Sequence, residues 1–178
     1  MSKRVWMTVA AMGMASVIAG TGLAWAQSPR GALSDADHKF LLEAAEGGQM
    51  EVELGKLAQQ KGSSDAVKQF GQRMAADHAK AGQELAQLAA GKGIELPKQP
   101  AQKTQMAKDR LTKASGAAFD REHVKMMVKD HKKDVAPFKR ESQQAKDPDL
   151  KAWVTKTLPT LEDHLQVIKQ IESQAARQ

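Results

Sequence analysis

The sequence contains no cysteine, so it can form neither a disulfide bond nor a cysteine-linked lipid anchor. Aromatic residues make up only 4% of the chain, and they do not form the aromatic-basic pattern of a nucleic-acid-binding surface. No segment alternates polar and apolar residues as a β-strand does. Neither a Gly-x-Ser-x-Gly motif nor a phosphate-binding glycine loop is present. Together these absences argue against nucleic-acid binding and do not favour an enzyme.

The first residues have the composition of an export signal. A short basic start, "MSKR", precedes a long apolar run that is rich in small residues. The run ends in Ala24-Trp25-Ala26, the small-x-small form that signal peptidases cleave. We therefore predict a signal peptide over residues 1–26, a periplasmic location and no transmembrane anchor after cleavage. A retained membrane anchor is the alternative.

The remainder is long enough for one domain with a hydrophobic core. We expect a flexible segment at 27–33 and a single domain at 34–176. The formal charge is +6, and removal of Lys3 and Arg4 would leave +4. The lysines that remain fall mostly on predicted helix faces. Weak association with the envelope surface and formation of a homo-oligomer stay open.

Apolar spacing and capping residues predict an all-α fold with four long helices and a short extra helix between the second and the third. Ser34, Ser63 or Ser64, and Asp147 are the expected N-caps, with Asp37 in a capping-box position. The expected helices span about residues 35–61, 65–90, 104–114, 117–146 and 148 to near the C-terminus. Each long helix carries one apolar stripe, which predicts a four-helix bundle around a shared core. Leu85 and Leu161 belong to these stripes.

Glycines and prolines inside the predicted helices lead to two further structural predictions. Gly47 and Gly48 lie inside the first predicted helix, where we expect them to allow close approach of another helix. Pro137 and Pro159 lie inside the last two long helices, where each should bend the helix and free a carbonyl one turn earlier.

A weak internal repeat links the two halves of the domain. Asp77-His78 recurs 86 residues later as Asp163-His164, and Asp37-His38 is followed 85 residues later by Glu122-His123. This near-constant offset is typical of a duplicated helical hairpin. The matches are short, so chance is the alternative.

Every one of the five histidines follows an acidic residue, and the phrase Met-x-x-Asp-His occurs twice, in "MAADHAKA" and "MVKDHKKD". At about 100° per residue, Glu51, His78 and His131 fall on the inward faces of three helices, and His164 falls at the edge of a fourth stripe. A buried carboxylate needs a partner. Four-helix bundles meet this need with carboxylate–histidine metal sites, although a structural hydrogen-bond network is an equal alternative.

The candidate metal ligands are Glu51, Asp77, His78, Asp130, His131 and His164. Iron, manganese or copper would suit such a set. Met74 and Met127 each precede a candidate histidine by four residues and so share its helix face. They would add a preference for copper(I) if they were ligands, and they fill the core otherwise.

Long stretches of the chain closely resemble the domain-of-unknown-function 4142 family. They are "FLLEAAEGGQMEVELGKLAQQKGSSDAVKQFGQRMAADHAKAGQELAQLA", "SGAAFDREHVKMMVKDHKKDVAPF" and "DPDLKAWVTKTLPTLEDHL". The resemblance covers about residues 34–172. It implies a ferritin-like four-helix bundle and an exported bacterial protein, some members being described as outer-membrane proteins. The family's recurrent positions are Glu51, Asp77, His78, Asp130, His131, Pro159 and His164, whereas His123 stands where members commonly carry tyrosine.

The leading functional hypothesis is a metal-binding envelope protein linked to stress. The rival is a non-catalytic structural or interaction protein of the cell envelope, whose buried histidines and carboxylates only specify packing.

Overall fold

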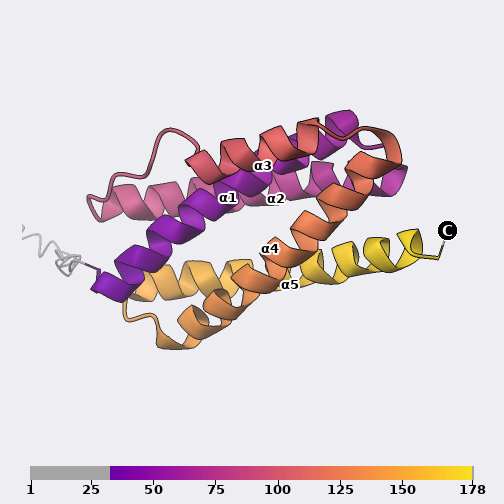
Figure 1. Cartoon of the computed structure of the whole chain (residues 1–178). Helices are drawn as coiled ribbons and strands as arrows, with labels where there is room; N and C mark the ends of the chain where they lie inside the picture. The colour runs from indigo at the N-terminus through magenta and orange to yellow at the C-terminus, as the bar shows by residue number, and fades with distance from the viewer. Residues whose placement is uncertain (1–32, 178) are drawn as a thin grey trace, which may run out of the picture. The chain divides into compact units, whose positions relative to one another are not determined.

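The computed structural model describes residues 33–177, which lie in one compact unit and form five α-helices without a strand (Figure 1). The helices are α1 (Asp35–Lys61), α2 (Asp65–Gly91), α3 (Gln102–Thr112), α4 (Gly116–Gln144) and α5 (Pro148–Ala175). This confirms the all-α bundle and the short extra helix, α3, before the third long helix. The predicted signal peptide and most of the predicted flexible segment lie outside the described residues.

Side-chain caps fix the starts of three long helices. The Ser34 hydroxyl accepts the Asp37 N–H at 3.1 Å, Ser64 accepts from Val67 at 3.3 Å, and the Asp147 carboxylate accepts from Leu150 at 2.9 Å. Each bond satisfies a backbone donor that has no partner within the helix. The predicted caps are therefore confirmed, with Ser64 rather than Ser63 at α2.

Asp37 has a role that the capping-box interpretation did not anticipate. Its side chain is only 2% exposed, and its carboxylate accepts the backbone N–H groups of Lys146 at 3.2 Å and Asp147 at 3.0 Å. These donors belong to the turn between α4 and α5. Asp37 thus ties the start of α1 to that turn.

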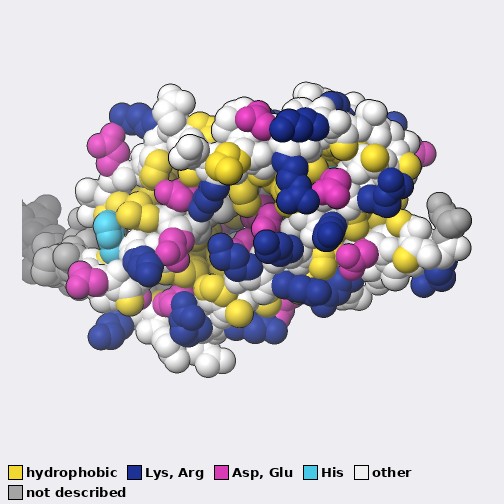
Figure 2. Space-filling model, viewed as in Figure 1, with side chains coloured by type: hydrophobic (Ala, Val, Ile, Leu, Met, Phe, Trp, Pro, Cys, Tyr) yellow, Lys and Arg dark blue, Asp and Glu magenta, His cyan; other side chains and the backbone are white. Residues whose placement is uncertain are grey.

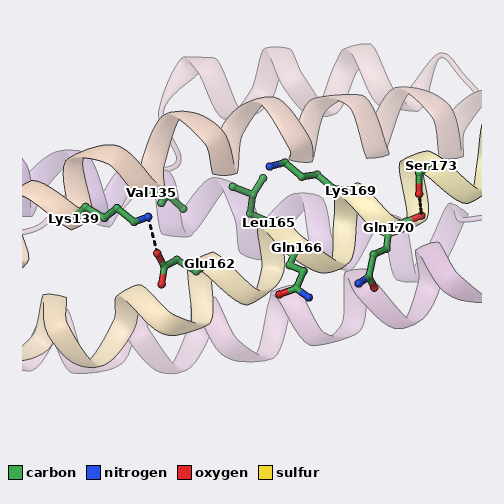
Figure 3. A pocket seen from close by; sticks show the side chains of 8 residues that line it. All are labelled: Val135, Lys139, Glu162, Leu165, Gln166, Lys169, Gln170 and Ser173. Carbon is green, nitrogen blue, oxygen red and sulfur yellow. Dashed lines mark hydrogen bonds and ion pairs between the residues drawn. The ribbon is translucent and has the colours of Figure 1, made fainter.

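The helices pair as two hairpins, α1 with α2 and α4 with α5, and the hairpins meet through α2 with α5 and α1 with α4. The short α3 packs against α1 and α4. A groove of about 430 Å³ runs along the α4–α5 pair, where Lys139 of α4 reaches Glu162 of α5 at 2.8 Å (Figure 3). None of the described helices combines the length and the apolar character needed to cross a bilayer.

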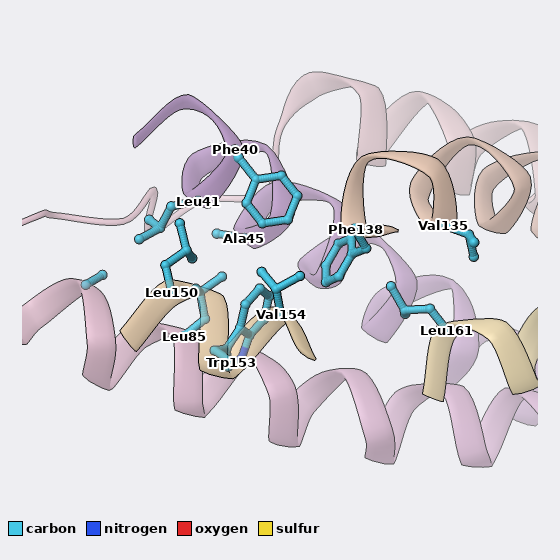
Figure 4. Packing of buried hydrophobic residues seen from close by; sticks show 11 residues of the cluster. Phe40, Leu41, Ala45, Leu85, Val135, Phe138, Leu150, Trp153, Val154 and Leu161 are labelled. Atoms are coloured by element: carbon cyan, nitrogen blue, oxygen red, sulfur yellow. The ribbon is translucent and has the colours of Figure 1, made fainter. Parts of the chain in front are cut away.

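The four long helices share a core made of two clusters of buried hydrophobic residues. One cluster contains Phe40, Leu85, Phe138, Trp153 and Leu161, with the Phe138 ring 5.1 Å from Phe40 and 5.6 Å from Trp153 between centroids (Figure 4). The other cluster is centred on large side chains that are almost completely buried, namely Phe70, Met74, Phe119, Met127 and Ile168. The predicted burial of Leu85 and Leu161 is confirmed.

The glycines that permit close helix contact are not the predicted ones. A Cβ added at Gly47 or Gly48 would meet nothing within 4 Å. A Cβ at Gly55 would lie 2.7 Å from the Gly71 carbonyl oxygen, and one at Gly71 would lie 2.6 Å from the Gly55 carbonyl oxygen. The backbones of α1 and α2 therefore cross at Gly55 and Gly71, and the expectation for Gly47 and Gly48 was wrong. α4 and α5 continue through Pro137 and Pro159.

Candidate metal centre

Three histidines from three helices meet in the interior of the bundle. His78 of α2, His131 of α4 and His164 of α5 have ring centroids 5.3–5.8 Å apart. One ring nitrogen from each lies within 4.8 Å of the others. The side chains of His131 and His164 are fully buried, and that of His78 is 6% exposed.

Two of these rings have a tautomer that their neighbours determine. His131 Nδ1 lies 3.1 Å from the Met127 carbonyl oxygen, and His164 Nε2 lies 2.8 Å from Asp77 Oδ2. A carbonyl or carboxylate oxygen only accepts, so these two nitrogens carry the protons of the neutral rings. The opposite nitrogens, His131 Nε2 and His164 Nδ1, then present lone pairs.

Glu51 holds the third ring. Its Oε2 lies 3.1 Å from His78 Nδ1, and its Oε1 lies 3.5 Å from His131 Nδ1. When Glu51 is ionised, His78 Nδ1–H donates to it and His78 Nε2 presents a lone pair. Within the described residues His78 Nε2, His131 Nε2 and His164 Nδ1 are buried and have no hydrogen-bond partner. His131 and His164 therefore each have one nitrogen held by an acceptor and one without a partner, and His78 takes the same state when Glu51 is ionised.

Burial keeps these imidazoles neutral. Desolvation lowers the pKa of His131 to about 4, and the neighbouring His164 adds to the effect. Desolvation also lowers the pKa of His78 well below its usual value, followed by the effects of His164 and His131. The pKa of His164 is lowered by burial as well, although Asp77 acts in the opposite direction. Neutral imidazole is the form that binds metal ions.

The pKa values of three carboxyl groups near the rings are raised, whereas those of the histidines are lowered. Burial raises the pKa of Glu51 well above its usual value, and the charges of Asp134 and Asp130 add to this. Burial, followed by the charge of Asp130, raises the pKa of Asp134 to about 6, and burial raises that of Asp130. Ionisation of these carboxyl groups is therefore disfavoured in the absence of a cation, and a cation bound beside them would lower their pKa values again.

Asp77 is itself held in place from the other side. Arg73, one turn before it on α2, lies 3.4 Å from Asp77 and 2.6 Å from Asp163 of α5. The arginine links the two helices that carry His78 and His164. It orients the carboxylate that in turn orients His164.

The predicted site residues fall into three groups. His78, His131 and His164 come together, while Glu51 and Asp77 contact ring nitrogens of these histidines. Asp130 makes no hydrogen bond or ion pair with the three rings and lies in a cleft of about 830 Å³ that Glu51 and His78 also line. His164, expected at the edge of a stripe, is fully buried. The internal repeat places His164 86 residues after His78. Because His78 was predicted to point inward, the repeat could have predicted the burial of His164.

The other two histidines lie outside the cluster. His123 is fully buried, with its ring stacked on Phe119 at 5.9 Å between centroids, and burial lowers its pKa to about 4. His38 is exposed. A position after an acidic residue therefore does not by itself place a histidine in the cluster.

The fold and the site define a helical-bundle protein with a buried three-histidine cluster. The chain belongs to the family described as a domain of unknown function (DUF4142), whose family model matches residues 23–171. The resemblance stated from the sequence is thereby confirmed. A comparison with curated proteins gives no match.

Solved structures with the same arrangement of helices include three distant relatives in fold. A DUF305 fragment from Deinococcus radiodurans matches at 8% identity and TM-score 0.71, over 81% of this chain and 99% of that one. CopM in its Cu(II)-bound form matches at 16% identity and TM-score 0.64, over 78% of this chain and 96% of that one. A two-domain protein from Anabaena variabilis, with DJ-1/ThiJ/PfpI-like and ferritin-like domains, matches at 14% identity and TM-score 0.61, over 82% and 39%. At these identities the likeness concerns the fold alone.

Proposed function

We propose that this protein binds one transition-metal ion, with copper the leading candidate, through His78, His131 and His164. The observation that carries the proposal is the meeting of three buried imidazoles, each with one nitrogen in contact with a carboxyl or carbonyl oxygen and the other without a partner. Metal-binding histidines usually donate their second N–H to a carboxylate or a carbonyl in this way.

A purely structural network is the rival, and the unpartnered nitrogens argue against it. Buried polar groups in folded proteins are almost always hydrogen-bonded, because each unpaired one costs about 1–3 kcal/mol. A network that only fixed helix packing would gain stability by pairing these three nitrogens with one another or with a hydroxyl. His123, outside the cluster, also has unpartnered ring nitrogens, so the distinguishing feature of His78, His131 and His164 is that their rings meet at one place, as the ligands of one ion do.

The distances between the ring nitrogens of the three histidines would suit a bound ion after small side-chain rotations. Nitrogens bound to one tetrahedral ion at about 2.0 Å lie about 3.3 Å apart. The three ligand atoms lie within 4.8 Å of one another. Side-chain rotations that shorten the longest separation by at most about 1.5 Å would bring them to bonding geometry.

The ligand types decide between metals. Imidazole nitrogens suit copper, zinc, iron and nickel, and copper(II) binds most strongly in the general order of affinities. Manganese prefers carboxylates, so it is less favoured, since Glu51 and Asp77 contact the histidines' other nitrogens. CopM, which shares the fold, is known in a Cu(II)-bound form. Fully buried Met74 and Met127 belong to the neighbouring hydrophobic cluster, where they fill the core.

Glu51 has a defined part in this proposal. Glu51 Oε2 lies 3.1 Å from His78 Nδ1, and only the ionised carboxylate leaves the neutral His78 ring with Nε2 free of hydrogen. Because burial raises the pKa of Glu51, ion binding should release a proton from this pair. The Glu51→Gln variant should bind with fewer protons released, which calorimetry in buffers of different ionisation enthalpy would measure.

The decisive experiment is a titration of the metal-free protein with copper(I), copper(II), zinc(II), iron(II) and manganese(II), followed by melting curves. An ion that binds only the folded protein raises its melting temperature. We expect one equivalent of copper to bind and to raise the melting temperature of wild type, and His131→Gln to abolish both effects. His123→Gln, at an equally buried position outside the cluster, and the exposed His38→Gln are the matched controls.

The outcome that would contradict the proposal is equally plain. If no ion distinguishes wild type from His131→Gln, or if His123→Gln loses binding as fully as His131→Gln does, the cluster is not a metal site. The structural network would then be the remaining explanation.

We also propose that the protein acts in the periplasm. The support is the basic start, the apolar run and the cleavage-site form of Ala24-Trp25-Ala26. Mass spectrometry of protein from a periplasmic extract should find Gln27 at the N-terminus. Recovery of the chain with Met1 intact in the membrane fraction would refute the assignment.

A further inference from the structure

The cleft beside the histidine cluster is large enough for an organic molecule. Its volume is about 830 Å³, within the range of small-molecule sites. Much of its lining is hydrophobic and comes from the core cluster of Figure 4, including Phe40, Phe138 and Trp153, with Leu96 from the segment between α2 and α3. Nothing in the proposed metal site requires a hydrophobic space of this size.

Glycines keep part of the cleft open. Gly47 and Gly48 on α1 and Gly82 on α2 line it, and a Cβ at any of them would meet nothing within 4 Å. Glycine inside a helix lowers its stability by about 0.5–1 kcal/mol relative to alanine. These three glycines have neither a left-handed backbone nor a close helix contact that would require glycine. We therefore attribute to them the open space in the cleft.

The polar groups of the cleft are mainly acidic. Asp130 and Asp134 are half-buried in it and make no ion pair with the described residues. Of the three lysines in the lining, Lys98 and Lys103 are paired with glutamates, and Lys133 lies near enough to both aspartates to act on their pKa without forming an ion pair. Glu51, at 3% exposure, lines the cleft with an Oε1 that lacks a hydrogen bond, since His131 Nδ1 donates to Met127 instead. In Figure 2 acidic and hydrophobic side chains are visible between the lysines and arginines of this face.

The acidic and hydrophobic parts of the cleft are separated along the helices. On α1, Phe40 and Glu51 lie eleven positions apart, which corresponds to about 16 Å of helix. On α4, Asp130 precedes Phe138, and Phe138 packs against Phe40. An occupant that satisfies both parts has a hydrophobic body at the Phe40 side and a positive group at the Glu51 side.

We infer that this cleft binds an amphiphilic organic cation, a molecule with an alkyl or aromatic body and an ammonium head, whose head lies at Asp130, Asp134 and Glu51. The head-group end of the site adjoins the histidine cluster, since His78 also lines the cleft and Glu51 contacts His78, but the organic cation does not require a bound metal ion. A carboxylate head group would face these acids, and a neutral head group would leave Asp130 and Asp134 without an ion-pair partner, so neither is favoured.

The test is calorimetric titration of the full-length protein with three probes that share one chain and differ in head group: decylammonium, decanoate and decanol, each below its aggregation concentration. We expect decylammonium to bind with one-to-one stoichiometry and at least about tenfold more tightly than the other two, a factor that corresponds to about 1.4 kcal/mol. Asp134→Asn should reduce this preference while leaving decanol unchanged.

The Gly48→Leu variant tests whether decylammonium binds inside the cleft rather than on the outer surface. Its side chain would enter the open space, so decylammonium binding should fall at least about tenfold while circular dichroism and metal binding stay at wild-type levels. Ala118→Leu adds the same side chain at an exposed position of α4 outside the cleft and should bind like wild type.

Three outcomes would overturn the inference. They are preferred binding of decanoate, absence of decylammonium binding, and equal binding by wild type and Gly48→Leu. Because metal titration of the same variants is read separately, the failure of one proposal leaves the other tested on its own result.

Discussion

The two hairpins of this protein are built on a similar sequence plan but are held together differently. In the first, the backbones of α1 and α2 meet at Gly55 and Gly71, where neither position has room for a Cβ. In the second, Lys139 of α4 forms an ion pair with Glu162 of α5 beside a groove. Close backbone contact at two glycines thus marks the first pair, and a side-chain ion pair marks the second.

The same contrast appears in the histidines that the repeat relates. His78 and His164, 86 residues apart, enter the same buried cluster. His38 and His123, 85 residues apart, do not correspond, since His38 is exposed and His123 is fully buried. A repeat in sequence thus predicts equivalent surroundings only where the opposing helix faces are also equivalent.

The largest expected effect is a loss of stability when a buried leucine of either hairpin is shortened. Leu85 of α2 and Leu161 of α5 are 1% and 3% exposed in one hydrophobic cluster, so replacing either with alanine should reduce the free energy of unfolding by about 2–5 kcal/mol. Denaturant unfolding measures this. Met106→Ala, at a position 64% exposed, is the control and should change stability by less than about 0.5 kcal/mol. Near-wild-type stability of Leu161→Ala would mean that α5 is not packed as described.

The next largest effect is the pH dependence of stability that the burial of His123 causes. Burial lowers the folded-state pKa of His123 from 6.5 to about 4, so between these values the unfolded chain binds a proton that the folded protein does not. The free energy of unfolding should therefore fall on acidification from pH 6.5 to about 4, by roughly 3 kcal/mol from this residue, and should be unaffected by it above pH 6.5.

Two variants isolate that contribution. His123→Gln should flatten the pH dependence of stability between pH 6.5 and 4 by about one proton, whereas Met106→Ala, at an exposed position without a titrating group, should keep the wild-type slope. Unfolding curves at a series of pH values provide the comparison. Equal slopes for His123→Gln and wild type would show that His123 is not buried as a neutral ring.

A smaller effect tests the backbone contact of the first hairpin. In Gly71→Ala the new Cβ would lie 2.6 Å from the Gly55 carbonyl oxygen and 2.7 Å from the Ala58 Cβ, so α1 and α2 must move apart. We expect a loss of about 1–3 kcal/mol from overpacking. Gly82→Ala on the same helix, with nothing within 4 Å, should cause no loss. Equal stability of the two variants would contradict the close crossing.

The smallest expected change is a gain in stability. Gly48 has a helical backbone and open space where a Cβ would lie, so Gly48→Ala should raise the free energy of unfolding by about 0.5–1 kcal/mol through its helix propensity. Thermal unfolding would detect the gain. A loss would show that α1 meets a neighbour at this position, as it does at Gly55.

The sequence by itself determined the helices. Periodicity and capping chemistry are local, so Ser34 and Asp147 could be assigned as caps, and the cap of α2 narrowed to Ser63 or Ser64, without knowledge of the partner helices. The apolar stripes likewise placed Leu85 and Leu161 in the core. The inward direction of Glu51, His78 and His131 followed from the same periodicity. The repeat indicated two hairpins.

Only the tertiary structure decided how the helices meet. Which glycines make contact depends on where two helices cross, and this is set by the combined shape of both surfaces, so Gly55 and Gly71 could not be told from Gly47 and Gly48. Likewise the rotation and relative height of α2, α4 and α5 brought His164 fully inside, placed Asp77 and Glu51 on the outer nitrogens of the rings, and left Asp130 in the cleft. Local sequence fixes the angle of a residue around its own helix, whereas a site formed by three helices depends on their mutual placement.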